Sequence, residues 1–230
     1  MKKKVNNLKR TYYQFQEFLI NQNSEKDYSD SFGSQKGQVD FLINNIFDYE
    51  KNGLPRNRYF IDLAAGDGVT YSNTFFIEKY LGWKGLLIEA NPYFIEKIES
   101  SRQSKLITEC IGEKEGEKIN FRVDNEMLAG IVGEEFDNNK QNRGGELENA
   151  EIITLFTKSL EKVLDNNNCP QEIDYLSLDI EGAEMDVLES FPFDKHCVRF
   201  MTVETNLDKD KEREVIDLLQ KHGYIHEGGT

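Results

Sequence analysis

The chain is poor in several residue types that mark particular protein classes. Its three cysteines, Cys110, Cys169 and Cys197, are widely spaced and form no CxxC pair. An odd number at such spacing indicates neither a disulfide framework nor a zinc site, and it is typical of reduced thiols in a cytoplasmic protein. Basic residues are also scarce, since 28 Lys and Arg stand against 42 Asp and Glu, a formal charge of -14. Because that charge repels phosphates and anionic lipids, we expect neither a nucleic acid nor a membrane as partner.

Long apolar runs are missing as well. The basic start, residues 1–4, is followed by polar residues instead of the apolar stretch of a signal peptide, and no run is long enough to span a bilayer. The composition, 38% hydrophobic and 30% charged over 230 residues, suits one α/β domain of ordinary size with a short helical extension. We therefore predict a cytoplasmic protein, either monomeric or homodimeric.

Apolar runs and helical patterns alternate along most of the chain. Strands are predicted at residues 59–63, 86–89, 105–110, 173–179, 198–204 and from 224, with a side strand at 118–123. Helices are predicted at 72–80, 92–100, 159–164, 183–189 and 209–222. Residues 133–149, rich in Asn, Gly and Glu, are expected to form a mobile loop or insertion. Strands that alternate with helices favour a mostly parallel sheet, which places ligands at the carboxyl ends of its strands.

The N-terminal region is expected to be helical. Apolar residues recur at helical spacing at Tyr12, Phe15, Phe18 and Leu19, and again at Val39, Leu42 and Ile46. We predict that residues 1–54 form a helical segment that packs on or caps the core, and that residues 55–230 form the main domain. Because the sequence stops as the strand from residue 224 finishes, we expect the closing strand of such a sheet to be missing.

A glycine-rich turn, DLAAGDG at residues 62–68, follows the first predicted strand. Glu89 ends the second strand at about the distance at which an acid can hold a ribose diol, so the pattern fits an adenosine-containing cofactor. Asp62 and Asp67 would oppose a pyrophosphate, and Tyr71 replaces the third glycine of a dinucleotide turn. S-adenosylmethionine carries no phosphate and bears a sulfonium and an ammonium group, so the acidic turn favours it. The alternative of a turn without any ligand stays open.

Five stretches together resemble the FkbM-type methyltransferases. They are SQKGQ at residues 34–38, FIDLAAGDG at 60–68, IEANP at 88–92, DYLSLDIEGAE at 174–184 and VE at 203–204. The resemblance implies a class I methyltransferase fold, Rossmann-like and doubly wound, with strand order 3-2-1-4-5-7-6. It also implies S-adenosylmethionine bound around Gly66 and by Glu89, and O-methylation, often of sugars or other polyols. The chain departs from the family in its missing final strand and in the insertion near Asn138, which bear on substrate binding more than on cofactor binding.

The expected cofactor site combines the turn, the strand ends and the helix openings that follow them. Its candidate residues are Gln35, Asp62, Ala64, Gly66, Asp67, Gly68, Tyr71, Ser72, Asn73, Glu89, Ala90, Asn91, Cys110, Ile111 and Asp179. Three of these assignments have structural alternatives. Ser72 could be only a helix N-cap, Cys110 could be a plain core residue, and the stretch with Gln35 could be a solvated helix start.

Acidic residues gather where two further strands end. Asp179 and Glu204 follow strands that the fold makes neighbours, and Glu181 comes two residues after Asp179. We predict Asp179, Glu181 and Glu204 as catalytic residues, one of them acting as general base on a hydroxyl. Alternatively, Asp179 and Glu204 bind Mg²⁺ or another divalent cation, Glu181 caps the next helix, or Asp179 contacts the cofactor without a metal. His196 is a further candidate base, against an ordinary surface role.

These patterns predict a methyltransferase that uses S-adenosylmethionine to modify a hydroxyl of a small polar substrate, such as a sugar, nucleotide sugar or saccharide. Two alternatives remain. One is N-methylation of an amine-bearing metabolite, because nothing in the sequence separates oxygen from nitrogen acceptors. The other is a non-catalytic module of a larger protein that binds S-adenosylmethionine.

Overall fold

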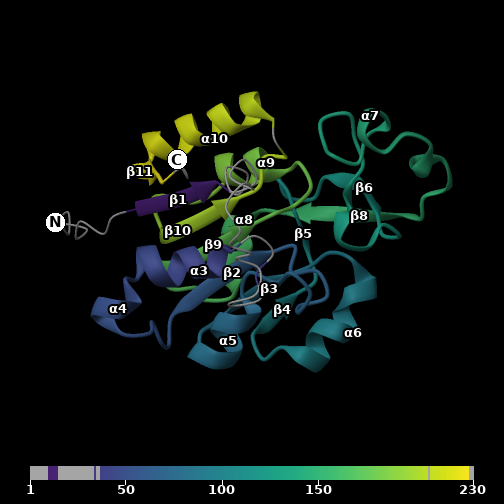
Figure 1. The fold of residues 1–230 in the computed structure, drawn as a ribbon. Helices are drawn as coiled ribbons and strands as arrows, with labels where there is room; N and C mark the ends of the chain where they lie inside the picture. The colour runs from purple at the N-terminus through teal and green to yellow at the C-terminus, as the bar shows by residue number, and fades with distance from the viewer. Residues whose placement is uncertain (1–9, 15–33, 35–36, 207, 228–230) are drawn as a thin grey trace, which may run out of the picture.

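Seven strands form the central sheet in the computed structural model, which describes residues 10–14, 34, 37–206 and 208–227 (Figure 1). In spatial order they are β11 (Tyr224–His226), β1 (Arg10–Gln14), β10 (Cys197–Val203), β9 (Glu172–Leu178), β2 (Tyr59–Leu63), β3 (Lys84–Ile88) and β4 (Lys105–Ile107). Every neighbouring pair runs parallel. The sheet confirms the predicted α/β, Rossmann-like class.

Helices cover both faces of this sheet (Figure 1). The elements packed on one face are α3 (Gln38–Phe41), the π-helical turn η1 (Leu42–Ile46), α5 (Phe75–Leu81) and α6 (Pro92–Ser101). Those on the other face are α8 (Leu160–Asn166), α9 (Glu184–Glu189) and α10 (Lys209–Lys221). Strand side chains alternate between the layers, so Phe60 joins the first apolar cluster and Ile61 joins the second. This coverage explains why the central strands are nearly continuous apolar runs.

Strand β1 corrects the prediction of a helix at the start of the chain. It pairs with β10, where Thr11 lies opposite Phe200, and with β11, where Arg10 lies opposite Tyr224. The residues TYY favour a strand, and pairing on both sides outweighs the helical spacing of the apolar positions. The rest of the predicted helix, with Phe15, Phe18 and Leu19, lies outside the described residues. β1 thus lies within the sheet, between β10 and β11. In the order that the resemblance implies, 3-2-1-4-5-7-6, this is the position of strand 7, the closing strand.

The predicted helix from residue 38 is found, and it packs on the sheet. Val39, Leu42 and Ile43 are fully buried against Phe60 and its neighbours. A short helix, α4 (Tyr49–Asn52), follows before the chain enters β2. The division of the chain at residue 54 stays a prediction. β1, which falls within residues 1–54, is part of the central sheet.

A second, four-stranded sheet lies beside the central one (Figure 1). Its order is β5 (Cys110–Ile111), β8 (Ile152–Lys158), β6 (Lys118–Arg122) and β7 (Gly130–Ile131). The predicted side strand is therefore confirmed as β6. The single strand predicted at residues 105–110 is divided between β4 and β5, and β8 escaped prediction.

The segment predicted as a loop, residues 133–149, contains α7 (Lys140–Arg143) and the 3₁₀ helix η3 (Gly144–Asn149). Asn138 within it is fully buried, and the Asp137 backbone N–H donates to the Glu181 carbonyl at 3.0 Å. Composition alone does not distinguish a buried, hydrogen-bonded asparagine such as Asn138 from a solvated one, and the segment has more regular structure than the predicted loop.

Within the described part of the chain, no helix combines the length and the apolar character required to cross a bilayer.

Candidate active site

A cavity of about 290 Å³ opens at the carboxyl ends of β2, β3 and β9. One wall is the turn after β2, and the opposite wall comes from the second sheet and from the 3₁₀ turn η2 (Glu126–Leu128). Ligands of parallel α/β sheets bind at this edge because loops and helix starts converge there. The cavity therefore lies where the sequence predicts the functional site.

Most of the predicted site residues line this cavity. From the cofactor set they are Asp62, Ala64, Gly66, Tyr71, Ser72, Asn73, Glu89, Ala90, Cys110, Ile111 and Asp179. From the catalytic set they are Asp179, Glu181 and Glu204. Residues far apart in the sequence thus come together in one hollow.

Three predicted cofactor residues are not among those that line the cavity, and their role in binding stays a prediction. Asp67 accepts hydrogen bonds from the backbone N–H groups of Val69 and Thr70. Gly68 closes the turn with φ +81°. Asn91 caps α6 and donates to the carbonyl of Val123 at 3.1 Å. These residues shape the turn, and they do not line the cavity. Gln35, a further predicted cofactor residue, lies outside the described residues.

Glu89 is held in a fixed orientation by two backbone donors. Its carboxylate accepts the N–H of Gly66 at 2.8 Å and the N–H of Asn91 at 2.7 Å. Burial raises the pKa of Glu89 to about 7. Each carboxylate oxygen retains a further lone pair, so the group can still accept hydrogen bonds from a diol in the cavity.

Asp62 lies at the base of the same turn. Thr74 Oγ1 donates to its carboxylate at 2.5 Å, and burial raises the pKa of Asp62 to about 6. Beside it, Asn73 donates through Nδ2 to Ser177 Oγ at 3.1 Å, while its buried Oδ1 has no partner among the described residues. Asn73 thus brings an acceptor without a donor to the cavity wall, which suits a ligand with an ammonium group.

Arg102 supports the turn, and sequence reasoning missed it. Its guanidinium is fully buried and donates to the Gly68 carbonyl at 2.8 Å, to Thr74 Oγ1 at 2.9 Å and to Glu78 Oε2 at 3.1 Å. The residue follows α6 in a polar stretch, where sequence offers no sign that separates it from a solvated charge. Arg102 ties the turn to the start of α5.

Replacing Arg102 with Met should lower the free energy of unfolding by about 3 kcal/mol, because the Gly68 carbonyl loses its charged donor and Glu78 loses its ion pair while keeping the Gln103 N–H. Denaturant unfolding measures this change. The matched control is Arg58→Met, since Arg58 lies at the surface 3.6 Å from Asp174 and should contribute about 1 kcal/mol or less. Equal effects of the two substitutions would contradict the structural role of Arg102.

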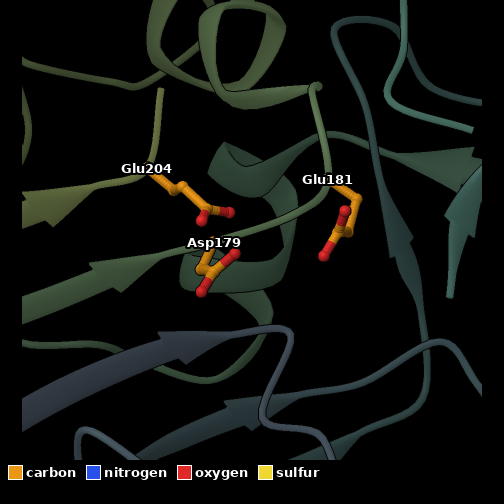
Figure 2. Close-up of side chains that lie close together, drawn as sticks. All are labelled: Asp179, Glu181 and Glu204. Atoms are coloured by element: carbon orange, nitrogen blue, oxygen red, sulfur yellow. The ribbon is translucent and has the colours of Figure 1, made fainter. Parts of the chain in front are cut away.

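Three carboxyl groups face one another on the other side of the cavity (Figure 2). Asp179 directly follows β9, Glu204 directly follows β10, and Glu181 lies in the turn after β9 with φ +56°. Their oxygens can lie within 4.8 Å of one another. Burial and the charge of Asp179 raise the pKa of Glu181 to about 8, and they also raise the pKa of Glu204. Carboxylates at this spacing repel one another when ionised, so a proton or a cation bound between them would stabilise the cluster.

Two neighbours of the cluster clarify how it is built. Glu184 accepts the backbone N–H groups of Ile180 and Gly182 at 2.9 and 3.2 Å, so Glu184 holds the turn. Arg143 from α7 donates to Glu181 at 3.1 Å, and it is the one cationic side chain among the described residues that line the cavity. Glu181 makes no cap of α9, which removes that alternative. Sequence reasoning missed Arg143 because its segment was predicted to be a loop.

His196 lies away from the cavity, which corrects its prediction as a catalytic base. It precedes β10 and so lies at the amino end of that strand, opposite the edge that carries Glu204. Its Nδ1 lies 2.9 Å from the carbonyl oxygen of Pro170, and the residue is buried. The expected surface role is corrected too, since His196 is part of the packing at that edge.

The buried acids give the stability a definite dependence on pH. Burial raises the pKa of Asp62 to about 6, and those of Glu89 and Glu184 to about 7. In the unfolded chain such groups titrate near pH 4, so the native protein binds more protons above that pH and loses stability as they ionise. We expect the melting temperature without ligands to fall by several degrees between about pH 5 and pH 8. A rise over this range, measured by scanning calorimetry, would contradict the burial of these groups.

Comparison with known proteins adds one match. The family model described as the methyltransferase FkbM domain matches residues 62–225, which is well over half of the chain. No curated protein and no solved structure matches the chain. The matched range begins at Asp62 in the glycine-rich turn, includes the acidic cluster and extends into β11. Since the match and the parallel α/β fold agree, the chain belongs to the FkbM methyltransferase family.

Proposed function

We propose that this chain uses S-adenosylmethionine to methylate a hydroxyl of a small polar substrate, such as a sugar, nucleotide sugar or saccharide. One observation carries the proposal, namely that the turn with Gly66 and Glu89 shares a cavity with the Asp179, Glu181 and Glu204 cluster. Family membership supports methyl transfer. The choice of oxygen follows from the cluster, because a neutral amine needs no strong base whereas a hydroxyl does.

The residues around the turn fit the cofactor chemically. The carboxylate of Glu89 would accept the ribose hydroxyls, and Asn73 Oδ1 and Asp62 would face the ammonium group. Gly66 has no side chain and so permits close approach to its backbone. Small and apolar surface comes from Ala90, which follows β3, and from Cys110 and Ile111, which form β5. When bound, the cofactor supplies an electrophilic methyl group on a positively charged sulfur.

The acidic cluster would prepare the acceptor. Burial and the nearby Asp179 raise the pKa of Glu204, so the pair would hold one proton between its two carboxyl groups. Asp179, which directly follows β9, would accept the proton of the substrate hydroxyl as the oxygen attacks the methyl carbon and the carbon–sulfur bond breaks. Glu181, oriented by Arg143, adds a hydrogen-bond acceptor for a neighbouring hydroxyl.

A second candidate mechanism uses a divalent cation. The carboxylate oxygens of Asp179 and Glu204, with those of Glu181 nearby, are hard ligands of the kind that Mg²⁺ prefers. A cation there would replace the shared proton and lower the pKa of the acceptor hydroxyl. Activity that survives exhaustive chelation would exclude this version and leave general-base catalysis.

The test proceeds in two steps. Calorimetry with S-adenosylmethionine, S-adenosylhomocysteine and NAD establishes whether the chain binds the proposed cofactor and rejects a pyrophosphate. Mass spectrometry then detects methylated products in a panel of sugars, nucleotide sugars and amines. Methylation of amines alone would replace O-methylation by the N-methylation alternative, and binding without any product would favour a non-catalytic module. Small molecules are the proposed partners, with a monomer or homodimer as the assembly.

A further inference from the structure

Met127 lies directly over the glycine turn, from the opposite wall of the cavity. It belongs to η2, between β6 and β7. A Cβ placed on Gly66 would lie 2.6 Å from Met127 Sδ and 3.2 Å from its Cε, and no atom of Leu128 lies within 4 Å of that point. Both Gly66 and Met127 line the cavity. The thioether therefore occupies space beside the backbone that the proposed cofactor must approach.

The backbone after Met127 is held in place by contacts with distant residues. Leu128 accepts a hydrogen bond from Asn138 Nδ2 at 3.1 Å, and Gly130 lies against Asn138 and the Glu181 side chain. Glu126, by contrast, has φ +46°, a backbone conformation that side chains other than glycine rarely adopt. Met127 itself is 36% exposed. The Met127 side chain can leave Gly66 by rotation about its own bonds, without breaking the backbone hydrogen bonds from the Leu128 N–H to the Asn125 carbonyl and from the Ala129 N–H to the Glu126 carbonyl. Movement of the residues after Met127 would instead break packing and the hydrogen bond from Asn138.

We propose that Met127 is a removable plug on the cofactor turn, which withdraws when S-adenosylmethionine or its product binds. The inference rests on the proposed function, since it assumes that this turn holds the cofactor. A protein that must leave one conformation to bind loses affinity by the fraction of molecules that are already open. The contact between Met127 and Gly66 thus sets how tightly the cofactor binds.

The test compares S-adenosylhomocysteine binding by calorimetry in the wild type, M127A and I152A. Removing the plug should tighten binding about fivefold, because the closed state loses its contact with Gly66. I152A removes an exposed apolar side chain of β8 that does not line the cavity, and it should stay within about twofold of the wild type. Met127 and Ile152 are both partly exposed, so neither substitution threatens the fold, which thermal unfolding confirms.

Each outcome decides a separate point. Binding by the wild type that M127A leaves unchanged or weakens would overturn the plug and leave the proposed function intact. Weaker binding would mean that Met127 is instead a fixed wall in contact with the cofactor. If neither the wild type nor M127A bound S-adenosylhomocysteine, the proposed function would fail and the plug with it. Binding by M127A alone would support both proposals.

Discussion

Replacing Glu89 with glutamine should weaken S-adenosylhomocysteine binding by about 100-fold. The carboxylate of Glu89 uses one oxygen for the N–H of Gly66 and the other for the N–H of Asn91. A glutamine amide can satisfy only one of these donors, because its nitrogen would point its own hydrogens at the other. The substitution therefore disturbs the turn and removes the negative charge that would accept the ribose hydroxyls.

Calorimetry measures the affinity, and thermal unfolding reports whether E89Q remains folded. The matched control is Glu99→Gln, which removes the charge of an exposed glutamate on α6 and should leave affinity unchanged. A folded E89Q protein that binds within about threefold of the wild type would show that Glu89 orients the turn without contacting the cofactor.

The second large effect is expected from Asp179→Asn, which should lower kcat by about 100- to 10,000-fold. Asparagine keeps the size of the side chain and cannot accept the hydroxyl proton. Because the glycine turn and Glu89 are unchanged, the affinity for S-adenosylhomocysteine should fall by less than about tenfold. Single-turnover assays separate these two quantities. The control is Asp186→Asn on α9, outside the cavity, which should stay within about twofold of the wild type.

Glu204→Gln distinguishes the two versions of the mechanism. If Glu204 carries the shared proton, a neutral amide replaces a neutral acid, and kcat should fall by only about tenfold. If Glu204 is a metal ligand, the same change removes a charged oxygen, and activity should become limited by the concentration of added Mg²⁺. Full activity of D179N would exclude both versions.

The sequence could predict those site residues that come at or just after the end of a strand. Glu89, Asp179 and Glu204 each follow a short apolar strand, and the parallel fold then places them at one edge. The same rule could have excluded His196, since a residue just before a parallel strand lies at the opposite edge. Local pattern and one fold-level rule therefore account for most of the cavity.

The residues that escaped prediction depend on contacts between distant segments. Arg102 supports the glycine-rich turn only because Gly68, Thr74 and Glu78 surround it in space. Arg143 comes from a segment whose composition indicates a loop, and Met127 comes from a stretch without a predicted element. The proximity of both residues to the site depends on how the second sheet packs. The sequence predicts a helix where β1 lies, because the spacing of apolar residues says nothing about which strands are available for pairing.

The placement of β1 has a consequence for how the protein is made. Its partners are residues 200–203 on one side and residues 224–226 on the other, so β1 must wait for its second partner until residues 224–226 have left the ribosome. Bringing such remote segments together is slow, because the entropy of closing a long loop is lost before the contacts form. Among the strands of the described residues, β11 pairs only with β1. Assembly is therefore expected to proceed outward from β2 and β9, with β1 and β11 docking together as its last event.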